Sequence, residues 1–178
     1  MGPTSRWAVL QTTAPGLGTP KRGHYRVRVQ IFPVDWDDTG AVLLREQQRA
    51  EIEQRYGRPD SEPGPPPSAA DIAHFVLATD ADRTPLGCGG LRQLDATTGE
   101  VKRMYVVPSS RGTGVAGAVL TALEAHARTL GWTHLRLETG TEQPDAIAFY
   151  TRHGYAPIPC FGHYTEEPTS RCFERALS

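Results

Sequence analysis

The sequence has few cysteines, no long apolar run and almost no excess charge of one sign. Three cysteines in 178 residues, without a C-x-x-C pair, argue against a secreted disulfide framework and favour reduced thiols. No apolar run approaches the roughly 20 residues that a membrane span needs. A net charge of -1 indicates neither a nucleic-acid-binding tail nor a disordered acidic chain. Because the opening residues also lack a signal-peptide pattern, we expect a cytoplasmic protein without nucleic-acid or membrane partners.

The histidines and cysteines do not form a recognisable metal-ligand pattern. Cys160, His163 and Cys172 come closest, but their spacing is irregular and lacks a second C-x-x-C or H-x₃-H pair. We therefore expect no bound metal.

The first 23 residues differ in composition from the rest of the chain. They contain several prolines, glycines and threonines without hydrophobic periodicity, which predicts a flexible arm over 1–23. The remainder, 24–178, is long enough for one domain with a sizeable core.

Hydrophobic periodicity predicts an α/β domain. The expected strands cover 25–32, 74–79, 86–94, 100–107, 133–139, 155–159 and 171–175. The expected helices cover 40–56, 69–72, 114–130 and 144–152. The middle strands follow one another through short turns, which predicts an antiparallel meander, whereas the later strand-helix-strand order implies a parallel crossover. Together these elements predict a mixed, twisted sheet with helices on both faces.

A glycine-rich turn leads directly from the strand 100–107 into the helix 114–130. Gly112 and Gly114 can adopt positive φ, so that successive N–H groups point at one anion, and Arg111 adds a full positive charge. The spacing fits neither the dinucleotide G-x-G-x-x-G pattern nor the Walker pattern. The turn is therefore either a phosphate-binding loop of another kind or only a tight strand-to-helix connection.

Two segments resemble the GCN5-related N-acetyltransferase (GNAT) family. Arg111-Gly-Thr-Gly-Val-Ala116 is similar to the R-x-x-G-x-G/A signature, and Ala146-Ile-Ala-Phe-Tyr-Thr-Arg-His-Gly-Tyr155 is similar to the segment A-x-x-F/Y-Y-x-x-x-G-F/Y. The matching elements span 88–159. The resemblance implies a GNAT-like fold, acetyl-CoA as the acyl-donor cosubstrate, and a homodimer as one form of the protein.

The resemblance also implies a coenzyme A site, with the pyrophosphate on the glycine-rich turn and pantetheine along the preceding strand, whose exposed amides can pair with it as an added strand would. The cofactor-binding residues implied in this way are Met104, Tyr105, Val106, Arg111, Gly112, Thr113, Gly114, Val115 and Ala116.

Acyl transfer to an amine requires the neutral amine, which for a lysine-like group is roughly 0.04% of the total at pH 7. Glu100 is the candidate base, because several relatives place a catalytic glutamate at the start of this strand. Tyr150 matches the general-acid tyrosine of the family and is the candidate donor to the departing thiolate. The candidate substrate residues are Arg103, Glu138, Phe161, His163 and Tyr164.

The sequence thus predicts an enzyme that transfers acetyl from acetyl-CoA to a primary amine of a small molecule, such as an amino acid, a polyamine or an antibiotic-like compound. Three alternatives stay open. The chain could be a non-catalytic coenzyme A sensor, an acetyltransferase for protein N-termini or lysines, or a general binding module for phosphate ligands. The sequence does not choose the acceptor.

Overall fold

The computed structural model describes residues 28–57 and 63–178. The predicted arm over 1–23, and the beginning of the strand expected at 25–32, lie outside the described residues. Within the described ranges the strands and the three longer helices follow one another in the expected order.

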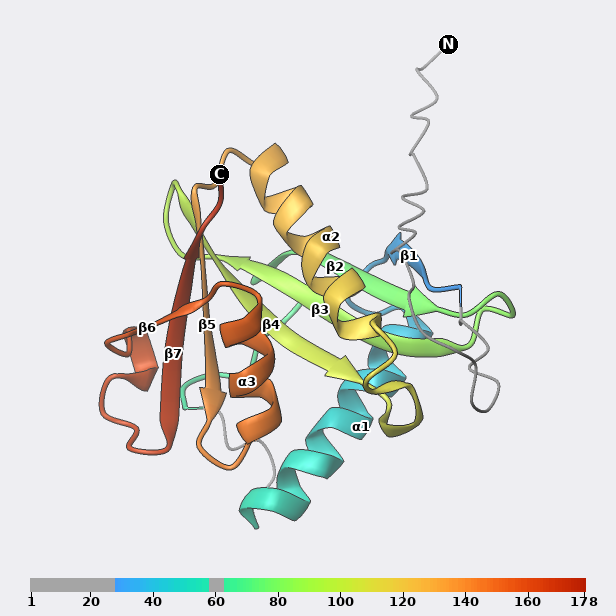
Figure 1. The fold of residues 1–178 in the computed structure, drawn as a ribbon, viewed down its shortest axis with the longest axis horizontal. Helices are drawn as coiled ribbons and strands as arrows, with labels where there is room; N and C mark the ends of the chain where they lie inside the picture. Colours follow the sequence, from blue (N-terminus) through green and yellow to red (C-terminus); the bar gives the residue numbers. More distant parts are fainter. Residues whose placement is uncertain (1–27, 58–62) are drawn as a thin grey trace, which may run out of the picture.

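The sheet contains seven strands, and three α-helices pack on it (Figure 1). The strands are β1 (Gln30–Pro33), β2 (Ile72–Thr79), β3 (Pro85–Gln93), β4 (Thr98–Val106), β5 (His134–Gly140), β6 (Ala156–Ile158) and β7 (Ser170–Ala176). The helices are α1 (Thr39–Tyr56), α2 (Val115–Thr129) and α3 (Pro144–Arg152), with short 3₁₀ turns at Pro108–Ser110 and Gly162–Tyr164.

The strand order is β1-β2-β3-β4-β5-β7-β6, and only the central pair β4 and β5 runs parallel. Short turns make β2, β3 and β4 antiparallel neighbours, α1 lies between β1 and β2, and α2 carries the chain across the sheet before β5. In Figure 1 α2 and α3 lie on the near face of the sheet and α1 lies behind it. The predicted mixed sheet with helices on both faces is confirmed.

Helix α1 has the ends that its sequence predicts. Asp38 caps the N-terminus, with its carboxylate accepting hydrogen bonds from the amides of Gly40 at 2.9 Å and Ala41 at 3.1 Å. Gly57 ends the helix in the left-handed conformation, with φ of 69°. These two signals fix the helix within one residue of the expected range.

Two apolar clusters fill the space between the sheet and its helices. The larger lies on the face of α2 and α3, where Val115, Val119 and Leu123 follow the helical spacing that the sequence predicts. The smaller lies under α1 and includes Leu44 and Phe75. Both faces of the central strands are therefore covered by apolar side chains.

One local expectation was wrong. The short helix expected at 69–72 does not form, because the Asp71 amide donates to the Ser68 carbonyl in a turn and β2 already begins at Ile72. Strand β1 ends at Pro33. The strand tolerates this proline because β1 is an edge strand, so the missing N–H costs no hydrogen bond within the sheet.

The expectation of reduced thiols is also wrong for two of the cysteines. Cys160 and Cys172 form a disulfide, with their Cα atoms 5.1 Å apart, whereas Cys88 is buried as a thiol. The bond ties the loop after β6 to β7. Closing a loop of this length stabilises a fold by about 3 kcal/mol in the chain-entropy description.

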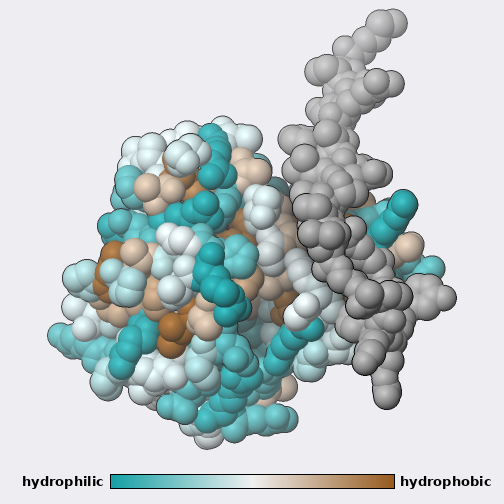
Figure 2. All heavy atoms as spheres, viewed as in Figure 1, coloured by the Kyte–Doolittle hydropathy of each residue, from teal (hydrophilic) through white to brown (hydrophobic). Residues whose placement is uncertain are grey.

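Hydrophobic residues on the face of α2 and α3 gather only in small separate patches, with hydrophilic residues between them (Figure 2). The larger exposed apolar side chains of the described residues, Leu43, Leu94 and Leu130, come from three different segments. Such single exposures are ordinary on a protein surface. No helix in the described ranges has the length and apolar character needed to cross a bilayer.

The stacked rings of His74 on β2 and His126 on α2 predict a loss of stability in acid. Their centroids lie 3.5 Å apart, and burial together with the charge of His126 lowers the pKa of His74 to about 4. The fold therefore favours neutral His74, so stability is complete above pH 6.5 and is lost as the pH falls toward 4. Because His74 is only half-buried, we expect a loss of about 1–2 kcal/mol from this residue.

The measurement is the free energy of unfolding in urea between pH 7 and 4, for the native chain and for His74→Gln. The variant should lose less stability over this range. The exposed His163→Gln is the matched control and should follow the native curve; equal acid sensitivity of all three proteins would contradict the prediction.

Candidate active site

Strand β4 carries one extra residue at its middle, and this bulge shapes the site. Gly90 pairs with Lys102 and Cys88 with Tyr105, so one residue of β3 stands opposite two of β4. Arg103 lies in the bulge with φ of 53°, in the left-handed region. A bulge bends its strand and increases the local twist. The bend turns the second half of β4 away from β5.

The two central strands separate immediately before this bulge. Their parallel pairing covers three positions only and ends with Glu100 opposite Arg136. Beyond that pair the backbone groups of β4 that face β5 have no strand partner. This fork gives an extended ligand a strand edge on which its amides can pair. The Met104 and Val106 carbonyls of β4 already accept hydrogen bonds from the side chains of Gln48 and Arg111.

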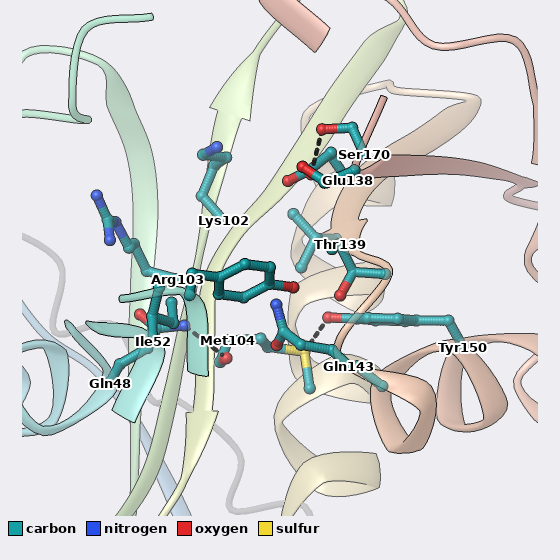
Figure 3. Close-up of a pocket in the computed structure, with 15 residues that line it drawn as sticks. Gln48, Ile52, Lys102, Arg103, Met104, Glu138, Thr139, Gln143, Tyr150 and Ser170 are labelled. Atoms are coloured by element: carbon teal, nitrogen blue, oxygen red, sulfur yellow. Dashed lines mark hydrogen bonds between the residues drawn. The ribbon is translucent and has the colours of Figure 1, made fainter. Parts of the chain in front are cut away.

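A cavity of about 120 Å³ lies in the fork (Figure 3). Residues of β4, β5, α1, α3 and β7 line it, among them Lys102, Met104, Glu138, Tyr150 and Ser170. Figure 3 shows Lys102, Glu138 and Ser170 at one end of the cavity and Met104 and Tyr150 at the other. The cavity therefore has a charged end and a less polar end.

Glu138 is the carboxylate of the cavity wall. Its Oε1 accepts a hydrogen bond from the Ser170 hydroxyl at 2.6 Å. Burial raises the pKa of Glu138 above its ordinary value, although the Ser170 hydrogen bond and the nearby charge of Lys102 oppose the rise. A carboxylate whose pKa is raised toward neutrality is a better proton acceptor than an exposed one.

Tyr150 reaches across the fork from α3 to β4. Its hydroxyl contacts the Met104 sulfur at 3.5 Å, and a thioether is only a weak acceptor. Burial, and to a lesser degree the charge of Glu138, raise the pKa of Tyr150, so the hydroxyl keeps its proton. The side chain is therefore a hydrogen-bond donor directed into the gap between the strands.

Glu100 lies beneath the fork and does not line the cavity. Its side chain is fully buried; Oε2 accepts from Arg92 at 2.6 Å and 2.9 Å, and Oε1 accepts from the Tyr164 hydroxyl at 2.8 Å. Lys102 adds a contact to Oε1 at 3.5 Å. Burial raises the pKa of Glu100, while the charge and hydrogen bonds of Arg92 act against that rise.

The glycine-rich turn presents its backbone to solvent. Gly112 and Gly114 have φ of 74° and 96°, and a Cβ at either position would meet no atom within 4 Å. Helix α2 follows without a side-chain cap and without an acidic residue in its first turn. Its first amides have no acceptor within the helix, so they are available to an anion, which the helix dipole also favours.

Arg111 and Thr113 brace this turn. The Arg111 guanidinium pairs with Glu51 of α1 and donates to the Val106 carbonyl at 3.1 Å. The Thr113 hydroxyl donates to the Ser110 carbonyl at 2.7 Å. The sequence predicts that Arg111 supplies charge to a phosphate; in the structure its guanidinium pairs with Glu51, and its contact with a phosphate stays a prediction.

The three aromatic and histidine candidates of the last loop have different surroundings. Tyr164 is buried and joins Glu100 and Lys102, with the Lys102 ammonium 2.7 Å from its hydroxyl. Phe161 packs against Tyr164, and Arg136 lies over its ring. His163 is exposed. None of the three lines the cavity.

Sequence reasoning missed Gln48, Lys102 and Ser170. Gln48, on α1, donates to the Met104 carbonyl at 3.0 Å, and its buried Oε1 has no hydrogen-bond partner among the described residues. A ligand N–H would satisfy that acceptor. Nothing local in the sequence marks Gln48, on a polar helix, or Ser170, at the start of a strand, as a residue of the site. Lys102 was detectable, because it is a charged residue at an inward-facing position of β4.

In the ranges that the structure describes, no group of three or more histidine, cysteine or acidic side chains is arranged to hold a metal ion. The features of the site are thus a strand edge without a strand partner, a glycine-rich turn with exposed amides, and a small cavity lined by the Glu138 carboxylate and by two tyrosines, Tyr56 and Tyr150.

Comparison with known proteins identifies this arrangement. The sequence profile of the Acetyltransferase (GNAT) family matches residues 30–155, which include the fork, the glycine-rich turn and α3. The chain belongs to the GNAT family. Its predicted membership and fold are confirmed.

The GNAT chain is 39% identical over 95 residues to "IAA acetyltransferase" of Azospirillum brasilense, covering 53% of this chain and 62% of that protein. It is 36% identical over 86 residues to the uncharacterised N-acetyltransferase YsnE of Bacillus subtilis (strain 168), covering 47% of this chain and 57% of that protein. The alignments therefore span about three-fifths of the length of these curated relatives.

Two solved structures support the GNAT fold. A provisionally named acyl-CoA N-acyltransferase from Klebsiella pneumoniae subsp. pneumoniae MGH 78578 superposes with a TM-score of 0.72 at 30% identity, over 84% of this chain and 98% of that chain. A GNAT family acetyltransferase from Elizabethkingia anophelis, with acetyl-CoA bound, has a TM-score of 0.61 at 17% identity, over 84% of this chain and 98% of that chain.

If the turn binds coenzyme A, Gly114→Ala should weaken that binding about 5- to 30-fold, because a side chain at this positive φ costs about 1–2 kcal/mol and shifts the amides. The measurement is the coenzyme A dissociation constant from thermal shift or calorimetry. Gly131→Ala is the matched control, since Gly131 also has positive φ and open space around it but lies at the other end of α2. Equal affinity loss in both variants would contradict a role for the turn.

Glu100→Gln should destabilise the GNAT fold by about 3 kcal/mol, because it removes the charge of Glu100 from the buried Lys102 and the half-buried Arg92. Glu174→Gln, which breaks the partly exposed pair with Arg136, should cost less than about 1 kcal/mol. Denaturant titration of both variants measures the difference. Similar losses would show that the buried cluster contributes no more than a surface pair.

Proposed function

We propose that this chain transfers the acetyl group of acetyl-CoA to a primary amine of a small molecule. The observation that supports this most directly is the fork between β4 and β5, which joins an anion-binding turn to a cavity holding both a carboxylate and a tyrosine. Family membership supports acetyl-CoA as the cosubstrate. We further propose that the protein acts in the cytoplasm, where acetyl-CoA is available.

The donor would lie along the fork. Its diphosphate would accept from the amides at the start of α2, and the pantetheine amides would pair with the open edge of β4 near Met104 and Val106. The thioester would then enter the cavity beside Tyr150. Backbone N–H groups of β4 would polarise its carbonyl oxygen.

Glu138 is the better-placed base. It lines the cavity, whereas Glu100 is buried behind it with both oxygens already hydrogen-bonded. In the reaction Glu138 takes a proton from the acceptor ammonium, and the neutral nitrogen attacks the thioester carbonyl. Glu100 keeps Lys102 and Tyr164 in position. Variants of the two glutamates can therefore test which of them is the base.

The carbon–sulfur bond breaks as the tetrahedral intermediate collapses, and the sulfur leaves with the electron pair. Tyr150 donates a hydrogen bond to this thiolate. The nitrogen loses its second proton as the amide forms. One of its two protons completes the thiol of coenzyme A and the other passes to solvent, so the products are the acetylamide and free coenzyme A. Because burial keeps the Tyr150 hydroxyl protonated, the donor is present throughout the pH range of the reaction.

Thermal-shift titration with acetyl-CoA, coenzyme A and ATP tests the donor site, and mass spectrometry of acetylated products from an amine panel tests turnover. Stabilisation by the two coenzyme A species but not by ATP, together with an acetylated small amine, would support the proposal. Binding without any acetylated amine would favour a sensor, and acetylation of peptides alone would favour a protein acetyltransferase.

Glu138→Gln should lower kcat/KM by about 10²-fold or more, with coenzyme A affinity unchanged, because the proton acceptor is lost. The acid limb of the native pH profile should have its midpoint above 4.5, since the pKa of Glu138 is raised, and should be absent in the variant. Glu174→Gln is the matched control on the neighbouring strand. If Glu100→Gln loses all activity but keeps its stability, and Glu138→Gln stays active, the base is Glu100 instead.

Tyr150→Phe should lower kcat about tenfold or more while leaving coenzyme A affinity unchanged, since the hydroxyl acts only on the departing sulfur. Tyr155→Phe is the matched control, because it removes another buried hydroxyl, one that donates to Glu124 at 3.2 Å outside the cavity. Steady-state kinetics should show normal turnover for the control. Equal turnover in both variants would exclude Tyr150 as the donor.

A further inference from the structure

The side-chain amide of Gln48 occupies the strand edge inside the fork. The Val107 amide, just after β4, donates to the Leu86 carbonyl of β3 at 2.9 Å. Because the backbone groups of successive residues point to opposite sides of a strand, those of Val106 and Met104 face the fork. Gln48 Nε2 donates to this Met104 carbonyl at 3.0 Å. The glutamine thus makes the hydrogen bond that an adjacent strand would otherwise make.

This contact determines how the Gln48 amide is oriented. A backbone carbonyl only accepts hydrogen bonds, so the NH₂ group must face Met104, and the amide oxygen is left for another donor. That oxygen, Oε1, is buried and has no hydrogen-bond partner among the residues that the structure describes, although Gln48 lines the cavity. A buried acceptor without a donor is costly. A ligand that brings an N–H group to Oε1 gains affinity by removing this cost.

Arg111 occupies the same strand edge in a different way. Its guanidinium donates to the Val106 carbonyl at 3.1 Å, but a guanidinium has no acceptor to offer a ligand. Gln48 uses one acceptor of the strand edge and presents another, its Oε1, in return. Of these two side chains, Gln48 is therefore the one that can recognise an N–H donor.

The N–H donor that fits Oε1 is that of a neutral amide. Oε1 carries no charge to compensate a buried ammonium, and the Glu138 carboxylate lies across the cavity from Gln48 (Figure 3). An amide N–H needs only an acceptor. The pantetheine arm of coenzyme A has secondary amides, and the nearer of them is separated from the sulfur by a short dimethylene link.

Met104 lies between Gln48 and Tyr150, which reach it from opposite sides (Figure 3). Gln48 contacts its carbonyl, and the Tyr150 hydroxyl contacts its sulfur at 3.5 Å. A donor whose sulfur lies at Tyr150 therefore has its nearer amide within reach of Gln48. On this basis we infer that Gln48 is a specificity-determining residue, whose Oε1 accepts the N–H of the pantetheine amide next to the sulfur. This inference rests on the proposed function and deepens its donor site.

A double-mutant cycle between protein and ligand tests this contact. The ligands are coenzyme A and an analogue in which an ester oxygen replaces the N–H of the amide next to the sulfur. The proteins are the native chain, Gln48→Met, and Gln47→Met as the matched control, because Gln47 is the exposed neighbour on α1. Calorimetry gives the dissociation constant of each pair, so neither an acceptor nor turnover is needed.

The native chain should bind coenzyme A about 5- to 30-fold more tightly than the ester analogue, the range expected of one buried hydrogen bond. Gln48→Met should lower this ratio about fivefold or more, because the acceptor is lost, and Gln47→Met should keep the native ratio. Each ratio is measured within one folded protein, so a general loss of stability does not imitate the result.

An undiminished preference for coenzyme A in Gln48→Met would overturn the inference while leaving the proposed function intact. Equal binding of the two ligands by the native chain would do the same. If Gln48→Met raises the KM of the acceptor while the ligand ratio stays native, Oε1 serves the acceptor amine and its assignment to pantetheine is wrong. If the native chain does not bind coenzyme A, the proposed function fails, and the inference fails with it.

Discussion

The bulge in β4 is the constraint on which the rest of the site depends. One extra residue at Arg103 turns the strand, and its pairing with β5 ends at Glu100 and Arg136. The sheet therefore opens at its centre, between two strands that are otherwise fixed by the crossover helix α2. A parallel pair that continued to the strand ends would close the cavity and remove the free edge for a ligand.

The polar cluster of Arg92, Glu100, Lys102 and Tyr164 closes the sheet below this opening. Buried charges are tolerated only when they are paired, and each member of this cluster contacts another. The disulfide joins the loop of Tyr164 to β7, next to the strand that carries Glu138. The fork is thereby supported from both sides: by buried ion pairs beneath β4 and by a covalent bond beside β5.

Most of the secondary structure was predictable because its signals are local. Asp38 and Gly57 determine the ends of α1, and Pro144 with the turn at Gly154 determines the extent of α3. The helix expected at 69–72 was wrong because the chain turns between Ser68 and Asp71 and enters β2 at Ile72. The disulfide was missed because two cysteines twelve residues apart become neighbours only when β6 turns back onto β7.

The sequence by itself determined the family, the glycine-rich turn and the position of Tyr150, because each follows from residues close together in the chain. Only the tertiary structure decided where the charged side chains lie. Glu100 and Glu138 are both strand glutamates, but pairing with Arg92 and Tyr164 buries one of them, whereas separation of the strands exposes the other to the cavity. Lys102 and Ser170 acquire their places for the same reason: strand register brings together side chains that the sequence keeps far apart.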